Sequence, residues 1–186
     1  VLDCNGNGKK DLAMGAPYAD ADFDSVLKGG EIWIVHQENM GTGLIIDSFT
    51  PNVQHYISGA GADDHASASM AAADVTGDGT DDLVVGAPDA DGSANNESQA
   101  GEGYVVKGGA SIATTINLRL VSNYTALFFG ESTGDRAGRS LSTGRFDADT
   151  INDIAIGAPG QGSPPGSAAR NAAGGGYVVL GRADFT

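Results

Sequence analysis

Hydrophobic positions along the chain fall into short runs that are separated by glycine and acidic residues. Residues 82–88, DLVVGAP, are apolar almost throughout, which is typical of a strand buried on both faces. Further runs rich in aromatic and β-branched residues are bounded by glycine, and this pattern indicates strands. These runs lie at 31–35, 55–59, 103–108, 126–130 and 176–181.

The stretch 67–75, SASMAAADV, leads into an acidic turn and is the remaining strand candidate. Its alanines leave the interpretation open, because the same residues would also suit a helical turn. No segment shows a sustained helical period, so the pattern predicts an all-β chain with about four short strands in each unit.

The chain repeats itself every 71 residues. The triplet Gly-Ala-Pro begins at Gly15, Gly86 and Gly157, and an acidic turn precedes it each time. Antiparallel four-stranded sheets that repeat in this way stack radially as the blades of a β-propeller. A linear β-solenoid is the competing architecture, although its repeats are usually much shorter.

The predicted blades cover residues 1–66, 67–137 and 138–186 of a single propeller domain. About three blades form an incomplete set, because a closed ring needs about four or more. We therefore expect this chain to be a segment of a longer protein, or to be completed by other protein segments or by copies of itself.

The acidic turns are rich in oxygen ligands. They read DCNGNGKKD at 3–11 (the first loop), DVTGDGTDD at 74–82 (the second loop) and RFDADTIND at 145–153 (the third loop). Side chains at positions 1, 3, 5 and 9, with the backbone carbonyl at position 7, would surround one point, and such hard oxygen donors suit Ca²⁺. The predicted Ca²⁺ ligands are Asp3, Asn5, Asn7, Lys9 and Asp11 in the first loop, and Asp74, Thr76, Asp78, Thr80 and Asp82 in the second.

The loops begin like an EF-hand but depart from it at the twelfth position, where Met14 and Val85 replace the expected glutamate. An apolar strand follows at once, so the pattern predicts a calcium loop within a β-hairpin. The alternative is a turn of glycine and aspartate that binds no ion.

The third loop departs further, because Arg145 occupies position 1 and Thr150 replaces the glycine at position 6. Its remaining candidate ligands are Asp147, Asp149 and Asp153. A guanidinium that bridges these carboxylates would replace the ion there.

Composition and the lack of known motifs argue against several classes of function. The formal charge of the 186 residues is -14, which argues against a nucleic-acid partner. No apolar run is long enough for a membrane span. Cys4 is expected to point outward and to be inert, the three histidines His36, His55 and His65 fit no known motif, and no catalytic motif is present, so we expect no enzymatic activity. The triplets at Asn96 and Asn123 are candidate N-glycosylation sites.

The loop pattern followed by Gly-Ala-Pro resembles FG-GAP repeats, the units of the integrin α-subunit propeller and its bacterial relatives. The Phe-Gly half of that motif is weak, since Ala66-Ser67 and Ala137-Gly138 stand at its place. The resemblance implies a seven-bladed propeller, Ca²⁺ on one rim and ligands on the opposite rim.

The expected function is thus an extracellular or cell-surface, calcium-binding module for adhesion or structural assembly, with a protein or carbohydrate ligand. The alternative is the propeller portion of a secreted enzyme that acts on polysaccharide or lipid.

Overall fold

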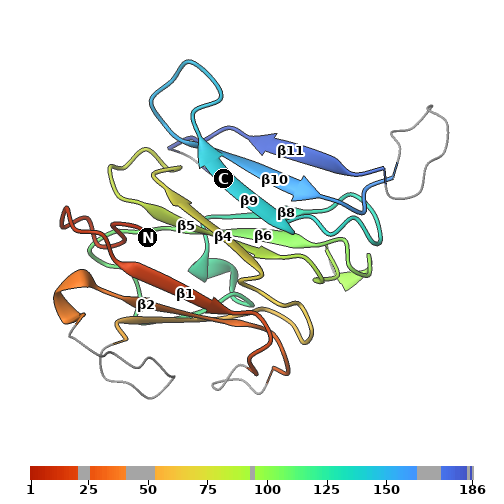
Figure 1. Ribbon diagram of the computed structural model, residues 1–186, viewed down its shortest axis with the longest axis horizontal. Coiled ribbons are helices and arrows are strands. Elements are labelled where there is room, and N and C mark those ends of the chain that lie inside the picture. The colour runs from red at the N-terminus through yellow and green to blue at the C-terminus, as the bar shows by residue number, and fades with distance from the viewer. Residues whose placement is uncertain (21–25, 41–52, 93–94, 163–172, 184, 186) are drawn as a thin grey trace.

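The computed structural model describes residues 1–186 except 21–25, 41–52, 93–94, 163–172, 184 and 186. The strands of the described part form three sheets, which are fanned one above another (Figure 1). We call these sheets blades 1, 2 and 3 in chain order. The all-β class and the incomplete propeller that the sequence predicts are confirmed.

Blade 2 is the complete unit. It contains β4 (Ser69–Ala73), β5 (Asp82–Ala87), β6 (Glu102–Val106) and β8 (Ala126–Phe129), hydrogen-bonded in that order and all antiparallel. The alanine-rich stretch is therefore a strand and not a helical turn, because its backbone pairs with β5 along its whole length.

Blade 3 repeats this plan with β9 (Ser140–Gly144), β10 (Asp153–Ala158) and β11 (Gly175–Val179). The registers agree between the blades, since Ser140 pairs with Gly157 just as Ser69 pairs with Gly86.

Blade 1 contains β1 (Leu12–Ala16), β2 (Glu31–Val35) and β3 (His55–Ser58), and a short strand, β7 (Thr115–Asn117), pairs with β3 in parallel. This parallel pair departs from the antiparallel pattern. The connection between β6 and β8 supplies β7, which brings the buried Ile116 opposite Ile57 at the edge of blade 1. Two short 3₁₀ helices, η1 (Gln37–Asn39) and η3 (Val121–Asn123), complete the described elements.

The core consists of two apolar layers, one on each side of blade 2. Leu83 and Val85 pack in the layer that contains Ile32, Ile34 and Ile57 of blade 1. The residue between them, Val84, lies in the other layer, together with Val105, Ile154 and Ile156. Adjacent side chains of a strand point to opposite faces, so a strand between two blades must be apolar at every position.

Small residues hold the place of the weak Phe-Gly motif. Ala66 and Ala137 are buried, and each donates its backbone N–H to a carbonyl of the loop before the strand, Gly29 or Ala100. A Cβ built on Gly30 would lie 2.1 Å from the carbonyl oxygen of Ala66. The backbones of the two segments are therefore in close contact at this point, and no side chain fits at Gly30.

Candidate metal loops

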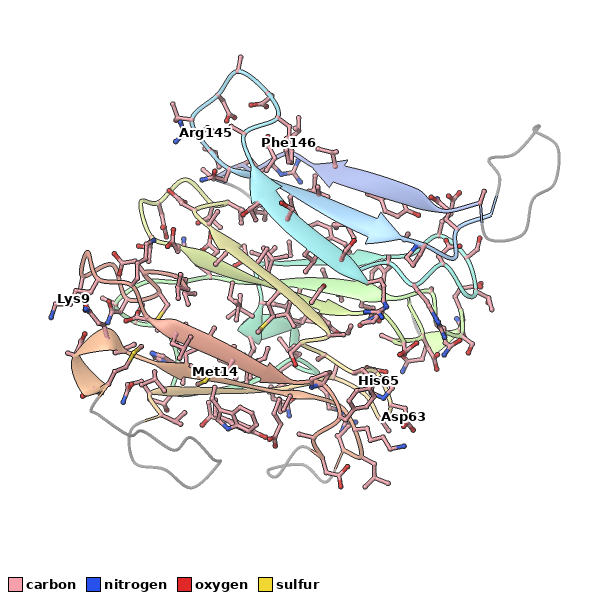
Figure 2. The ribbon with its side chains drawn as sticks, viewed as in Figure 1. Lys9, Met14, Asp63, His65, Arg145 and Phe146 are labelled. Atoms are coloured by element: carbon pink, nitrogen blue, oxygen red, sulfur yellow. The ribbon has the colours of Figure 1, made fainter. Side chains whose placement is uncertain are left out.

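The three acidic loops lie at the same end of the stacked blades. The first loop precedes β1, the second joins β4 to β5, and the third joins β9 to β10. Figure 2 shows Lys9 and Arg145 at this end, and His65 and Asp63 at the opposite end. We call the end with the loops the loop rim.

The first loop curls around its leading carboxylate. Asp3 Oδ1 accepts a hydrogen bond from the N–H of Asn7 at 3.0 Å, and Oδ2 accepts one from Gly8 at 2.7 Å. The Asn7 side-chain oxygen in turn accepts from the N–H of Lys9 at 2.8 Å. The glycines at positions 4 and 6 have φ of 72° and 79°, a left-handed conformation that favours glycine.

The second loop has the same geometry. Asp74 accepts from the N–H groups of Asp78 and Gly79 at 3.1 and 2.8 Å, and Asp78 accepts from Thr80 at 2.9 Å. Its glycines at positions 4 and 6 have φ of 72° and 88°. Two loops that are 71 residues apart therefore place their oxygen atoms at matching points.

Position 9 has a different environment, because its aspartate is fully buried. Asp82 Oδ2 accepts from the N–H groups of Val75 and Thr76, and Oδ1 accepts from Gly108, each at 3.0 Å. Burial raises the pKa of this carboxyl, and the three N–H donors offset part of that shift. Asp11 bonds in the same way to Cys4 and Gln37. The sequence pattern did not predict this fastening of strand to strand.

The donor atoms of the second loop fit calcium in kind, since all of them are oxygen. Thr76 Oγ1, at position 3, is buried and has no hydrogen bond of ordinary geometry, although the hydroxyl interacts with the Asp82 carboxylate. Within the described residues, no three loop carboxylates have oxygens within 4.8 Å of one another. Lys107 Nζ lies 3.1 Å from Asp78 Oδ2. An ion would therefore compete with backbone N–H groups and with this lysine.

The third loop is built differently. No residue of 145–153 has a positive φ, and Asp147 and Asp149 cap the N–H groups of Asp149 and Ile151 at 2.9 Å. Arg145 is exposed, and no described carboxylate lies within ion-pair distance of it. The suggested guanidinium bridge is therefore not formed in the described part of the chain.

The two sequons differ in exposure. Asn96 is exposed. Asn123 is partly buried, and its Nδ2, the atom that a glycan would modify, donates to the backbone oxygen of Asn117 at 3.0 Å. Glycosylation stays a prediction at both positions, and Asn96 is the more accessible of the two.

A cavity of about 280 Å³ lies among the turns of the three blades at the end opposite the loop rim. Its lining includes His65, whose Nδ1 lies 2.8 Å from Asp89 Oδ2, and Arg136, whose Nε lies 3.4 Å from Asp89 Oδ1. Arg139 also lines it. Two arginines in so acidic a chain give this cavity a local excess of basic groups.

A larger cavity of about 810 Å³ is lined by two partly desolvated carboxyl groups, those of Glu102 and Asp64. Burial raises the pKa of Glu102 to about 7 and that of Asp64 to about 6. The Tyr104 hydroxyl donates to Glu102. Sequence reasoning missed both groups, because neither lies in a recognisable motif.

The repeated sheets and their acidic hairpin loops define a segment of a β-propeller. The family model described as "FG-GAP repeat" matches residues 66–106, which confirms the predicted resemblance for that segment. That segment includes β4, the second loop, β5 and β6.

The chain is also similar to the phosphatidylinositol-glycan-specific phospholipase D of Rattus norvegicus. The two are 36% identical over 94 residues, which is 50% of this chain and 11% of that protein. The matched segment thus spans about a tenth of the relative's length.

Within the described residues, no helix has the length and apolar character needed to cross a lipid bilayer.

Proposed function

We propose that this chain is a calcium-binding propeller module that acts outside the cell in adhesion or structural assembly, without enzymatic activity of its own. The observation that carries the proposal is the matching geometry of the first and second loops. In each loop the side-chain oxygens at positions 1 and 5 accept backbone N–H groups of a tight glycine turn on one rim.

In the first loop, Asp3, Asn5 and Asn7 would hold the ion, together with the carbonyl of Lys9 and with Asp11. In the second, Asp74, Thr76, Asp78, the carbonyl of Thr80 and Asp82 would do so. A bound Ca²⁺ would neutralise the clustered carboxylates and fix the hairpin. The second loop carries three of these carboxylates against two in the first, so we expect it to bind more tightly.

An extracellular location suits this chemistry. FG-GAP repeats occur in extracellular or cell-surface proteins. Loops with few charged ligands bind calcium only modestly, and the concentrations that fill such sites are found outside the cell.

Calorimetric titration of calcium into the purified, chelator-treated chain tests the proposal. We expect saturable binding, and a stabilisation of about 2.7 kcal/mol per site at a free concentration 100 times Kd. Chelation should lower the melting temperature and added Ca²⁺ should restore it. A chain that binds no calcium, with the same melting temperature in chelator, would exclude the proposal.

A matched pair of variants assigns the sites. Asp78→Ala removes the position-5 carboxylate of the second loop, and Asp149→Ala removes its counterpart in the third. We expect the first change to eliminate the tightest binding event and the second to leave it intact. Asn7→Ala, at the same position of the first loop, should weaken only the lower-affinity event.

The second candidate function is the propeller portion of a secreted enzyme that acts on lipid or polysaccharide. The similarity to a phosphatidylinositol-glycan-specific phospholipase D favours it. Hydrolysis assays on lipid and polysaccharide panels distinguish the two, because the structural module alone should release no product.

We propose two kinds of partner. Further propeller segments or copies of the chain would cover the exposed side of blade 3. The cavity lined by His65, Arg136 and Arg139 would receive a protein or carbohydrate ligand with acidic or hydroxyl groups, which arginine side chains bind well.

A further inference from the structure

A second and chemically different set of candidate ligands lies where the first loop meets β2 and β3 of blade 1. Its members are Cys4, His36 and His55, and the Cys4 Sγ and one nitrogen from each ring lie within 4.8 Å of one another. Cys4 belongs to the first loop, His36 follows β2, and His55 begins β3. The expectation that Cys4 points outward is wrong, because its exposed fraction is 0%.

His55 is held in the tautomer that a metal ligand needs. Its Nδ1 lies 2.9 Å from the backbone oxygen of Ala113. A carbonyl oxygen only accepts hydrogen bonds, so Nδ1 carries the proton and the Nε2 lone pair of the neutral ring is free. A carbonyl that fixes the outer nitrogen of a histidine is the usual second partner of a metal-binding imidazole. Burial also lowers the pKa of His55.

The two imidazoles face each other through their Nε2 atoms. His36 Nε2 lies 3.0 Å from His55 Nε2, and Asn5 Nδ2 lies 3.2 Å from the other nitrogen of His36. Without a metal, a single proton between the two Nε2 atoms accounts for this contact. Both side chains therefore direct a nitrogen to the same point, next to the thiol.

We propose that Cys4, His36 and His55 form a transition-metal site that takes Zn²⁺. Zinc binds thiolate sulfur at about 2.3 Å and imidazole nitrogen at about 2.0–2.1 Å. In a tetrahedral site two such nitrogens are roughly 3.3 Å apart, and a nitrogen and the sulfur roughly 3.6 Å. The imidazole pair is within a few tenths of an ångström of that spacing, and the sulfur, at most 4.8 Å from either nitrogen, has at most about 1.2 Å to move.

Zinc suits this set better than calcium does, because one sulfur and two nitrogens are borderline to soft ligands. Three protein ligands leave the fourth position of a tetrahedral ion for water. Cys4 Sγ donates its proton to Asp11 Oδ2 at 3.0 Å. On zinc binding, that proton leaves to solvent and the thiolate bonds to the metal.

The proposed site lies where the first loop meets the connection from blade 2. The carbonyl of Cys4 accepts from the N–H of Gly109 at 2.7 Å, and Ala113, which holds His55, lies in the same connection between β6 and β7. A metal at this point would fasten the first loop to β2 and β3 of blade 1, beside the connection that comes from blade 2. Because its ligands are sulfur and nitrogen, it would select a different metal from the one that the oxygen atoms of the loop favour.

Calorimetric titration of Zn²⁺ into the reduced chain, in millimolar Ca²⁺ to saturate the loops, tests the proposal. We expect one Zn²⁺ per chain, and an affinity at least about tenfold weaker in Cys4→Ser and in His55→Gln. The serine that replaces Cys4 would be close to it in volume and would keep the hydrogen bond to Asp11, so the fold should persist, as circular dichroism can verify. His36→Asn changes the most exposed ligand and gives a further variant that should fold.

His65→Gln is the matched control, because His65 lies at the opposite end of the blades (Figure 2). Its zinc affinity should equal that of the parent chain. Co²⁺ in place of zinc should give a sulfur-to-metal absorption band that Cys4→Ser loses. Absence of zinc binding, equal affinity in all variants, or binding of Cu²⁺ but not Zn²⁺ would overturn the assignment.

Discussion

Removal of the Lys107 charge should tighten calcium binding in the second loop. Lys107 follows β6, and its ammonium nitrogen lies 3.1 Å from Asp78 Oδ2. The side chains of the two residues are 49% and 31% exposed, so water screens the pair strongly. Asp78 is a proposed calcium ligand, and the lysine therefore places a positive charge next to the point where the cation would bind.

The size of the effect follows from the geometry. A calcium ion about 2.4 Å from the carboxylate oxygen would be up to roughly 5.5 Å from the ammonium, whose nitrogen lies 3.1 Å from that oxygen. At this distance the repulsion between a double and a single charge in water is about 1.5 kcal/mol. Physiological salt, with a Debye length of about 8 Å, reduces it to about 0.8 kcal/mol. That energy corresponds to a roughly fourfold change in Kd.

Lys107→Gln should therefore bind calcium about fourfold more tightly at the second loop than the parent chain does, as measured by calorimetry. Lys28→Gln is the matched control, because Lys28 pairs with Asp63 at 3.2 Å on the opposite end. The gain should shrink in 1 M salt, where the Debye length is about 3 Å. Equal affinity of the Lys107→Gln variant and the parent at low salt would refute this electrostatic account of the loop.

Three further outcomes follow from the contacts. Asp82→Ala leaves three N–H groups without their acceptor, so in chelator it should lower the free energy of unfolding by about 3 kcal/mol or more in urea titrations. Burial raises the pKa of Glu102 to about 7 from 4.5, so its stabilising contribution is present below pH 4.5 and is lost as the pH rises through 7. Glu102→Gln should then be the more stable chain at pH 8, by about 3 kcal/mol, and its melting temperature should change less between pH 5 and pH 8 than that of the parent chain. Blade 3 exposes 60% of Val178 and 51% of Leu180, so light scattering should show association, and a stable 18.7 kDa monomer would contradict that expectation.

Local sequence patterns sufficed for the blades. Every run of apolar residues bounded by glycine became a strand, because strand geometry depends on neighbours two residues apart and on the turns at each end. The 71-residue period then fixed which strands are equivalent, as the shared register of β5 and β10 with their partners shows.

Contacts between distant segments could not be predicted in this way. β7 is only three residues long, and its parallel pairing with β3 depends on the path of a connection that the repeat pattern does not specify. The cluster of Cys4, His36 and His55 also depends on contacts between segments that are distant in the sequence. Its members are 32 and 19 residues apart, and only the pairing of β2 with β3 places the two histidines side by side.

The prediction that Cys4 points outward was wrong because it assumed that side chains alternate around the first loop. An even position was expected to face solvent, but the N–H and the thiol of Cys4 both donate to the buried Asp11 carboxylate. The need to satisfy that carboxylate turns the residue inward, because a buried acceptor without donors is costly.

The third loop shows that the acidic pattern serves two purposes, which are the fastening of the hairpin by position 9 and the proposed binding of calcium by the other positions. It has lost the leading carboxylate and both glycines, yet Asp153 keeps its full burial and accepts from the N–H groups of Phe146 at 2.6 Å and Gly181 at 2.8 Å. These donors lower the pKa of Asp153. Position 9 is therefore required by the fold, whether or not an ion binds. The capacity of such a loop for calcium is best judged from the leading carboxylate at position 1 and the glycines at positions 4 and 6, where the first and second loops agree and the third does not.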